Sequence, residues 1–397
     1  MFKKIASVLL ALLTVCLLTA CNNNSAGSGS QDPGSTSSQT STENPDNSSS
    51  DKIESSENSA SDSTENNAPS AVMVDNTLAL DKDALISTYP SKFEQLTYTD
   101  SDTGLPITYN LYLPENYDKA VSYPMVVFIG DSSCVGNNAT VSLTQGRGGI
   151  VWATEEWQSA YPTIVAVPTY PVTILDDHGS YTTTEYVELT KRYIDYMCEE
   201  YAVDRNRIYG TGQSMGCMTT LILASEYPDL YAACMFVDGQ WDINELKGLE
   251  NQNFVYFAAE DDTNAWNGAQ EVMGMFDGDS VEYTYAQWDG NWTPDELSEA
   301  AEELFTLETK QFFISWKTGT IEPKTSMGGS GGMGGFGGDK PGGPGGMKDN
   351  IEGGFGGPGG DGGSPGGNNS SAYHMASFDY AYNCIAVMEW LFQNVMR

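Results

Sequence analysis

A Gly-x-Ser-x-Gly pentapeptide, formed by Gly212, Ser214 and Gly216, constrains this chain more than any other stretch. The residues before it, Arg207 to Gly210, predict a short strand, and those after it, Met215 to Glu226, predict a helix with an apolar stripe. A sharp strand-to-helix turn holds the Ser in an exposed position, and Gly on either side lets the two backbones pass closely. The pentapeptide alone is weak evidence in a chain rich in Gly and Ser. Its flanks favour a nucleophile at Ser214 over an ordinary Gly-rich turn.

Predicted strands and helices alternate around this motif. The predicted strands are Phe93 to Thr99, Ile107 to Leu113, Tyr123 to Gly130, Thr163 to Val167, Tyr231 to Val237, Asn253 to Ala259, Val281 to Trp288 and Gln311 to Trp316. Capping-box patterns at Thr182-Thr183-Thr184-Glu185 and Thr293-Pro294-Asp295-Glu296 predict two helix starts, and a last helix is expected from Ser377. This alternation predicts an α/β fold whose mostly parallel sheet carries helices on both faces.

Residues 1–21 have the features of a bacterial lipoprotein signal peptide. Lys3 and Lys4 precede an apolar run that is short for a membrane span, and Leu18-Thr19-Ala20-Cys21 resembles a lipobox. We expect Cys21 to be acylated and to anchor the protein to the extracellular face of the cell membrane. Plain secretion with cleavage after Ala20 is the alternative.

Composition divides the remaining chain into three parts. Residues 22–75 are polar and acidic, and they predict a disordered tether because they offer little apolar surface to bury. Residues 76–397 predict one large domain. Within it, residues 328–367 are more than half glycine without a collagen period, which predicts a flexible insertion. Its position just before His374 leaves a role as an active-site flap open.

The formal net charge of −36 excludes several kinds of partner. A chain this acidic does not bind nucleic acid or an anionic membrane surface by charge, and it repels acidic polymers. We therefore expect membrane contact through the lipid alone, and a monomer. The cysteines after residue 21 match no zinc spacing and predict buried small side chains, so no metal or cofactor is expected.

A serine nucleophile needs a base, and the chain contains only 2 histidines, His178 and His374. In α/β-hydrolases the order along the chain is Ser, acid, His, which leaves His374 as the base. His374 is expected in a loop before the last helix, and His178 is interpreted as an exposed loop residue.

The acid should follow a strand that lies between Ser214 and His374 in the sequence. The strand predicted to end at Ala259 is followed by three acidic residues, of which Asp262 is the first choice and Asp261 the second. Asp238, which follows another predicted strand, is a third candidate.

Acyl transfer also needs donors for the developing oxyanion. The backbone N–H of Met215, directly after the nucleophile, is one candidate. The backbone N–H of Ser132, in the loop after the strand Tyr123 to Gly130, is the other.

Several stretches match a known family: Tyr109 to Pro114, Tyr209 to Gly216, Asp238 to Trp241, and His374 to Asp379 with Trp390 to Phe392. They resemble secreted α/β-hydrolase esterases related to polyhydroxybutyrate depolymerases and feruloyl esterases, which are similar to the prolyl oligopeptidase catalytic domain. The resemblance covers about Phe93 to Phe392 and implies an α/β-hydrolase fold with Ser214 as nucleophile, His374 as base and Asp262 as acid. Relatives commonly carry His-Gly in the oxyanion loop, where this chain has Gly130-Asp131. A carboxylate there opposes catalysis unless it points away from the oxyanion.

These observations favour a serine esterase that cleaves carboxylic esters, small or polymer-linked, through an acyl-enzyme. A serine exopeptidase is the alternative among enzymes. A non-enzymatic alternative is a glycan-binding surface lipoprotein that uses Trp241, Trp266, Trp288 and Trp292 as a platform.

Overall fold

The computed structural model describes residues 81–323 and 370–396. All of them belong to one compact unit, Ala68–Arg397. The signal peptide with Cys21, the tether at 22–75 and the Gly-rich insertion at 328–367 lie outside the described residues, so these expectations stay predictions.

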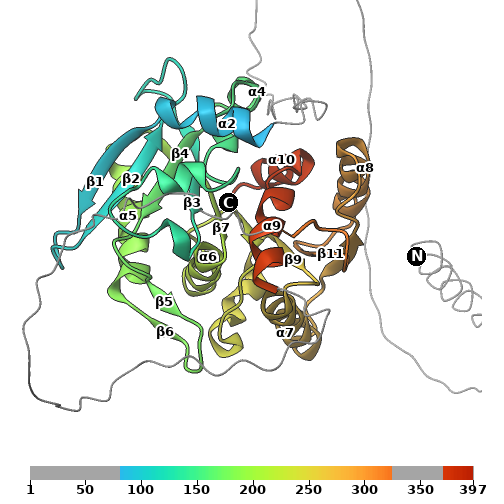
Figure 1. The fold of residues 1–397 in the computed structure, drawn as a ribbon. Coiled ribbons are helices and arrows are strands. Elements are labelled where there is room, and N and C mark those ends of the chain that lie inside the picture. The colour runs from blue at the N-terminus through green and yellow to red at the C-terminus, as the bar shows by residue number, and fades with distance from the viewer. Residues whose placement is uncertain (1–80, 324–369, 397) are drawn as a thin grey trace, which may run out of the picture. The chain divides into compact units, whose positions relative to one another are not determined.

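Within the described residues, nine strands form one sheet in the order β1-β2-β4-β3-β7-β8-β9-β11-β10 (Figure 1). The pairs β1–β2 and β2–β4 are antiparallel, and every other neighbouring pair is parallel. The strands are β1 Glu94–Thr99, β2 Pro106–Tyr112, β3 Tyr123–Ile129, β4 Ile164–Thr169, β7 Val203–Gln213, β8 Ala233–Val237, β9 Phe254–Ala259, β10 Thr284–Trp288 and β11 Gln311–Trp316. A separate short hairpin pairs β5 Leu175–Asp176 with β6 Thr182–Thr183.

Helices connect the strands and close the described part of the chain. They are α2 Lys82–Thr88, α3 Val141–Thr144, α4 Glu155–Ala160, α5 Glu185–Glu200, α6 Met215–Glu226, α7 Thr263–Asp279, α8 Pro294–Phe305, α9 Ser370–Ala381 and α10 Ile385–Gln393. Short 3₁₀ turns lie at η1 Pro90–Lys92, η2 Ser132–Cys134, η3 Val151–Ala153, η4 Ile243–Glu245 and η5 Lys247–Asn251. In the described part of the chain, no helix is both long enough and apolar enough to span a bilayer.

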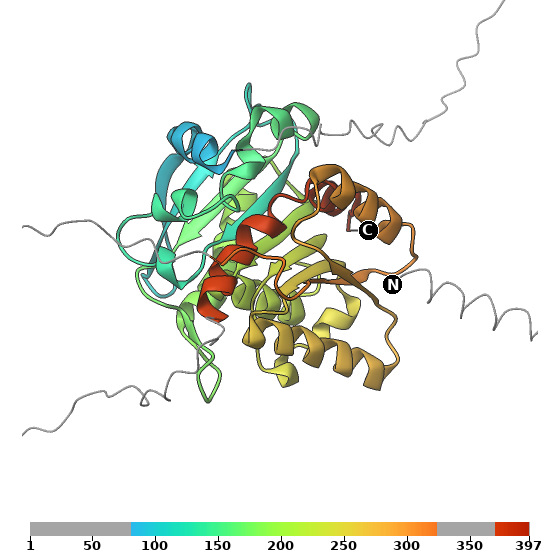
Figure 2. The same cartoon turned by 45° about the vertical axis from the view of Figure 1, so that its right-hand side comes forward.

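The central strands are buried on both faces, which explains their continuous apolar sequences. In β3, the side chains of Met125, Val127 and Ile129 pack with residues of α5, α6 and α7 on one face of the sheet. Val126 and Phe128 alternate with them and pack on the other face with residues of α4, α8, α9 and α10. Two views show α8 and α10 side by side on this second face (Figures 1 and 2). The mostly parallel sheet with helices on both faces is thus confirmed.

Every strand predicted from the sequence is present, with ends that shift by a few residues. The second capping box is also confirmed, because Thr293 and Glu296 exchange the expected hydrogen bonds at the start of α8. The first one is wrong. Thr182 and Thr183 belong to β6, and α5 is capped instead by Thr184, whose hydroxyl accepts the Tyr186 N–H. These β-branched residues favour strand conformation and pair with β5, so the helix begins only after them.

Candidate active site

The nucleophile candidate Ser214 lies between a central strand and a buried helix. Strand β7 ends at Gln213 and α6 begins at Met215, which leaves Ser214 alone in the turn with φ 51° and ψ −117°. Positive φ is uncommon for a residue other than Gly and marks a strained backbone. The N–H of Ser214 bonds to the Val237 carbonyl on the neighbouring strand at 3.1 Å, which ties the turn to the sheet.

The two flanking glycines are required by space rather than by flexibility. A Cβ placed on Gly216 would lie 1.9 Å from the carbonyl oxygen of Ile129, and one on Gly212 would lie 2.4 Å from the carbonyl carbon of Gly216. Both obstacles are backbone atoms, which cannot rotate away. The close crossing of β3, β7 and α6 therefore explains the pentapeptide.

We expect Gly216→Ala to lower the free energy of unfolding by about 3 kcal/mol, because the added methyl forces the packed backbones apart. Gly274→Ala is the matched control: it lies in α7, and a Cβ there meets no atom within 4 Å. That substitution should instead raise stability by up to about 1 kcal/mol, through helix propensity. Urea unfolding followed by circular dichroism measures both. Equal effects of the two substitutions would contradict the packing argument.

Ser214, His374 and Asp262 form one chain of hydrogen bonds. The distance from Ser214 Oγ to His374 Nε2 is 2.8 Å, and that from His374 Nδ1 to Asp262 Oδ2 is 2.5 Å. Asp262 is the N-terminal cap residue of α7, where the aligned peptide dipoles favour negative charge. It is buried, and the His374 side chain is 22% exposed. The structure thus brings together the three residues that the sequence proposed as nucleophile, base and acid.

His374 lies inside helix α9 rather than in the loop that we expected before the last helix. Its helix runs from Ser370 to Ala381, and the chain breaks only at a turn before α10. The last helix was predicted from Ser377 onward because its apolar residues mark the core face. The helix extends further towards the N-terminus because residues 370–376 contain neither Gly nor Pro.

Side chains of α9 and the turn after it fix this helix against the rest of the domain. Asp379 accepts hydrogen bonds from Lys82 Nζ at 2.8 Å and from the Arg147 N–H at 3.2 Å. The Tyr382 hydroxyl lies 2.9 Å from Thr211 Oγ1 on β7, the strand that leads into Ser214. These contacts hold the base at a fixed position relative to Ser214.

The other two acid candidates are buried and have different partners. Asp261 Oδ2 accepts the Gly319 N–H at 2.7 Å. Asp238 lies at the end of β8, where Oδ1 accepts the Ala259 N–H at 2.7 Å and Oδ2 contacts the Ser377 hydroxyl. Of the three candidates, Asp262 is the one that hydrogen-bonds to His374.

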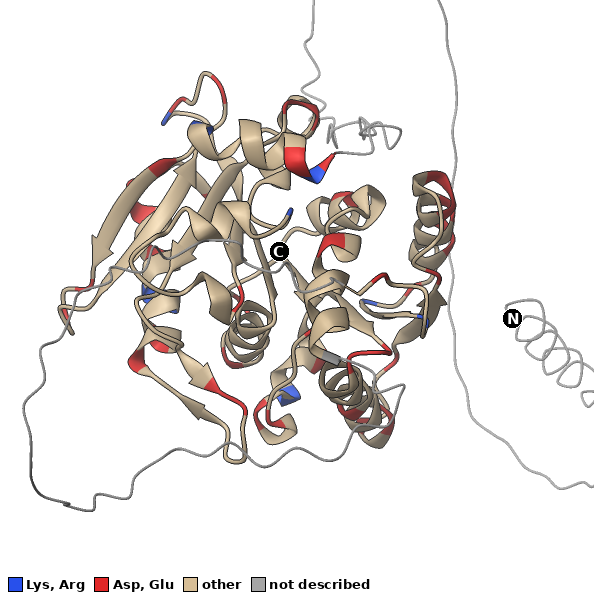
Figure 3. Cartoon of the chain, viewed as in Figure 1, with Lys and Arg blue, Asp and Glu red and all other residues tan. Residues whose placement is uncertain are grey.

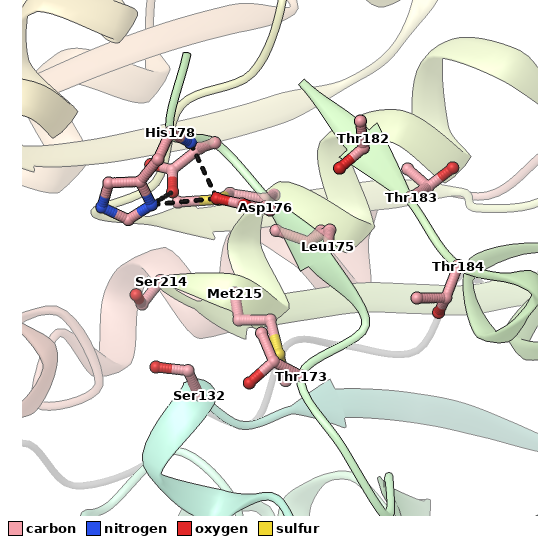
Figure 4. A pocket seen from close by; sticks show the side chains of 12 residues that line it. Ser132, Thr173, Leu175, Asp176, His178, Thr182, Thr183, Thr184, Ser214 and Met215 are labelled. Carbon is pink, nitrogen blue, oxygen red and sulfur yellow. Dashed lines mark hydrogen bonds and ion pairs between the residues drawn. The ribbon is translucent and has the colours of Figure 1, made fainter. Parts of the chain in front are cut away.

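The two oxyanion-hole candidates lie at the starts of helical turns. Met215 is the first residue of α6 and Ser132 the first of η2, and first-turn N–H groups have no acceptor within their own helix. Ser132, Ser214 and Met215 line one cleft, where they lie near each other (Figure 4). Both N–H groups are therefore available to a carbonyl oxygen that approaches Ser214.

Asp131, the unusual residue of the oxyanion loop, has both carboxylate oxygens engaged. Oδ1 accepts the Ser133 N–H at 2.6 Å, and Oδ2 accepts the Gln213 side-chain amide at 3.0 Å. The carboxylate thus caps η2 and links it to the end of β7. Its charge also raises the pKa of His374, because a nearby negative charge stabilises the imidazolium.

The charges around His374 set its protonation. Burial lowers the pKa of His374. The hydrogen bond and charge of Asp262, together with the charge of Asp131, outweigh burial and raise the pKa above its ordinary 6.5. Because the folded pKa is raised, the stability contributed by the imidazolium is fully present at low pH and is lost as pH rises through that pKa.

Activity that depends on neutral His374 should have an acid limb with its midpoint above 6.5. It should be lost as pH falls through this midpoint, because the imidazolium cannot accept the Ser214 proton. The pH profile of kcat/KM measures the midpoint. NMR titration of His178→Ala, which leaves His374 as the one remaining histidine, should give the same value. A midpoint clearly below the ordinary histidine value would contradict the effect of Asp262 and Asp131 on His374.

A cleft of about 340 Å³ opens above Ser214. Its opposite wall is the β5–β6 hairpin, which contributes Asp176, Asp177 and His178, and Figure 4 shows His178 and Asp176 across from Ser214 and Ser132. A second recess of about 200 Å³ shares Asp177 and His178 and is lined mainly by polar side chains. Sequence reasoning missed this wall because two-residue strands carry no hydrophobic alternation.

The structure confirms that His178 is an exposed loop residue, and it also places His178 on the rim of the cleft. Its side chain is 92% exposed and contacts Asp176 at 3.0 Å and Asp177 at 3.2 Å. In the described part of the chain, these three residues are the group whose ligand atoms lie close enough to hold a metal ion. Exposed acidic residues are common without a metal, and the three come from one short loop.

The described cysteines are Cys134, Cys198, Cys217, Cys234 and Cys384, and all are free thiols. Four are buried, and Cys198 is partly buried. The expectation of small buried side chains holds for the four.

Part of the chain matches a known protein family, and the fold is similar to that of solved structures. Residues 175–302, which include Ser214 and Asp262, match the model of the prolyl oligopeptidase family. No curated protein matches the chain. A crystal structure of a thermostable esterase is similar over 78% of this chain and 64% of that one, at 20% identity and a TM-score of 0.53.

Two further solved structures are less similar. One is a mutant of the feruloyl esterase module from Clostridium thermocellum complexed with sinapinate, at 14% identity, a TM-score of 0.40, and coverage of 59% of this chain and 84% of that one. The other is a ferulic acid esterase from Anaeromyces mucronatus, at 15% identity, a TM-score of 0.36, and coverage of 56% and 81%. The likeness to the thermostable esterase shows that the chain has an α/β-hydrolase fold, as expected from the sequence. The resemblance to polyhydroxybutyrate depolymerases stays a prediction.

Proposed function

We propose that this protein is a serine hydrolase that cleaves carboxylic esters through an acyl-enzyme. The observation that carries the proposal is the hydrogen-bond chain from Ser214 Oγ through His374 to Asp262, with distances of 2.8 and 2.5 Å. It lies at a strained strand-to-helix turn that opens into a cleft. The thermostable esterase with the same fold supports this reaction class.

The geometry supports a two-step reaction. His374 Nε2 takes the Ser214 proton while Oγ attacks the ester carbonyl, and the N–H groups of Met215 and Ser132 stabilise the oxyanion. The imidazolium, held by Asp262, returns this proton to the leaving alcohol and leaves Ser214 acylated. His374 then removes a proton from water as the water attacks the acyl-enzyme, and it returns that proton to Ser214 Oγ as the carboxylic acid is released.

The cleft favours neutral acyl groups over anionic ones. Asp176 and Asp177 line its wall, and acidic residues outnumber basic ones over the described elements (Figure 3). A second carboxylate on the substrate would be repelled there. Acetyl or aryl esters should therefore be better substrates than their succinyl counterparts.

A serine peptidase is the second candidate, because the match to the prolyl oligopeptidase family spans Ser214 and Asp262. A glycan-binding platform has less support. Trp241 and Trp288 are buried in the core, so these rings are not available to stack on a sugar.

Fluorophosphonate labelling of the purified chain tests the proposal, since the reagent reacts with an activated serine. We expect labelling of Ser214, its loss in Ser214→Ala, and turnover of acetyl, aryl or feruloyl esters faster than of peptide anilides. Faster turnover of the peptide anilides would favour the peptidase. No labelling and no turnover of either class would overturn the proposal.

A further inference from the structure

The third acid candidate, Asp238, connects three elements of the candidate site. It is fully buried at the end of β8, with φ 43°, a backbone conformation that few residues other than Gly adopt. Its N–H bonds to the Phe257 carbonyl at 2.9 Å, and its Oδ1 accepts the Ala259 N–H at 2.7 Å, both on β9. Its Oδ2 contacts the hydroxyl of Ser377 on α9. Ala259 lies three residues before Asp262, and Ser377 lies three after His374.

The hydrogen bonds of the Ser377 hydroxyl bear on the charge of Asp238, because this hydroxyl has two neighbouring oxygens and a single proton. Ser377 Oγ lies within hydrogen-bond distance of both Asp238 Oδ2 and the His374 carbonyl oxygen, the latter at 2.8 Å. A hydroxyl donates one proton, whereas a carbonyl oxygen and an ionised carboxylate can only accept. If Asp238 were ionised, the Ser377 hydroxyl could therefore donate fully to only one of its two neighbours. Both contacts are hydrogen bonds of full strength if Asp238 is protonated and donates to Ser377, which in turn donates to His374.

We propose that Asp238 is a positioning residue, held as a neutral carboxylic acid that donates to Ser377 Oγ and thereby fixes the turn of α9 that carries His374. The inference rests on the proposed function only for its consequence in catalysis, because the protonation itself is a property of the folded chain. It gives the site two carboxyl groups with different tasks. Asp262 is ionised and orients the imidazole of His374. Asp238 is neutral and fixes the backbone of α9 beside His374.

The surroundings of Asp238 favour its neutral form. Burial raises its pKa, and the nearby charge of Asp262 raises it further. His374, Ser377 and the Ala259 N–H act in the opposite direction, and the resulting pKa is about 7. The other titratable groups that face it are Cys217 on α6 and Tyr256 on β9, and burial raises the pKa of each far enough to keep both neutral. Two adjacent buried carboxyl groups do not readily ionise together.

Substitutions of Ser377 and Asp238 should give a distinctive pattern of changes in kcat. Measured below about pH 7, where Asp238 is protonated, Ser377→Ala should lower kcat about 10- to 100-fold with little change in KM, because His374 loses its support while the cleft is intact. Asp238→Ala should do the same or more. Asp238→Asn should restore kcat to within about tenfold of wild type, since an amide can donate to Ser377 and accept from Ala259 as the neutral acid does.

Asp261→Asn is the matched control, because Asp261 is also buried near the site but bonds to Gly319 rather than to α9. The kcat of this variant should be close to that of wild type. If Asp238→Asn were as harmful as Asp238→Ala, a negative charge would be required at this position and the proposal would be overturned.

The second readout needs no activity. The folded pKa of about 7 is above the unfolded value of 3.8, so the stability due to protonated Asp238 is fully present below the unfolded value and is lost as pH rises through about 7. The unfolding free energy of wild type relative to Asp238→Asn should therefore fall across this interval. A flat or rising difference would contradict protonation.

Infrared difference spectra give the most direct test. At about pH 5.5, where ordinary carboxyl groups are ionised, wild type minus Asp238→Asn should contain a carboxylic acid band. This band should be replaced by a carboxylate band at about pH 9. A carboxylate band at both pH values would overturn the proposal. If no ester is cleaved and Ser214 is not labelled, the proposed function fails, and the spectra still decide the state of Asp238.

Discussion

Ser214→Ala is expected to lower kcat for ester hydrolysis by about 10⁶-fold, with the fold intact. The reason is local: Ser214 Oγ is the atom at 2.8 Å from His374 Nε2, and an alanine methyl can neither attack the ester nor share that proton. His374→Ala should cost a similar factor, because without the imidazole the Ser214 hydroxyl keeps its proton. Single-turnover kinetics on an aryl ester measure both, and circular dichroism checks the fold.

The double substitution separates a cooperative pair from two independent residues. If Ser214 and His374 act as one unit, removing both should be hardly worse than removing either. Ser159→Ala, an exposed residue of α4, is the control and should be close to wild type. Wild-type turnover by Ser214→Ala would exclude Ser214 as the nucleophile. Losses that multiply in the double variant would contradict the shared proton.

Asp262→Asn is expected to lower kcat by about 10⁴-fold. Asp262 Oδ2 lies 2.5 Å from His374 Nδ1, so its carboxylate requires the proton on Nδ1 and leaves Nε2 free to accept from Ser214. An asparagine amide can donate to Nδ1 instead and stabilise the wrong tautomer. The loss should appear in kcat rather than in KM, because Asp262 does not line the cleft beside Ser214.

The two other candidates for the acid supply the comparison. Asp261→Asn should leave kcat close to that of wild type, since an asparagine carbonyl can still accept the Gly319 N–H. Asp238→Asn should also be mild, because a neutral side chain replaces a neutral one. An order in which Asp238→Asn is the most harmful of the three would identify Asp238 as the acid and refute both the role of Asp262 and the neutral state of Asp238.

The nucleophile turn could be predicted because its causes are local. Gly212, Ser214 and Gly216 stand at fixed offsets, and the helix that follows begins and ends at the predicted residues, Met215 and Glu226. The strands could be predicted for a similar reason. A strand buried on both faces reads as a continuous apolar run, and β3 and β9 do.

The candidate base could be predicted because the chain has only 2 histidines, but the helix in which it lies could not. With 2 histidines in the chain and one of them before Ser214, order left His374 alone. Whether it stands in a loop or in a helix depends on how α9 packs, and that is decided by contacts with residues hundreds of positions away, such as Lys82 to Asp379. The hairpin wall with His178 was missed because its strands are held by pairing rather than by a hydrophobic pattern.

The sequence by itself determined the α/β architecture, the turn at Ser214 and a short list of acids, because strand burial, turn geometry and chain order follow from neighbouring residues. Only the tertiary structure shows which of Asp262, Asp261 and Asp238 hydrogen-bonds to His374, and it is Asp262, the first choice from the sequence. Asp261 and Asp262 are adjacent in sequence, yet one bonds to Gly319 and the other to His374, since successive side chains leave the turn from β9 into α7 in different directions. Which direction meets the imidazole depends on where α9 docks, and no pattern within a few residues of Asp262 encodes that.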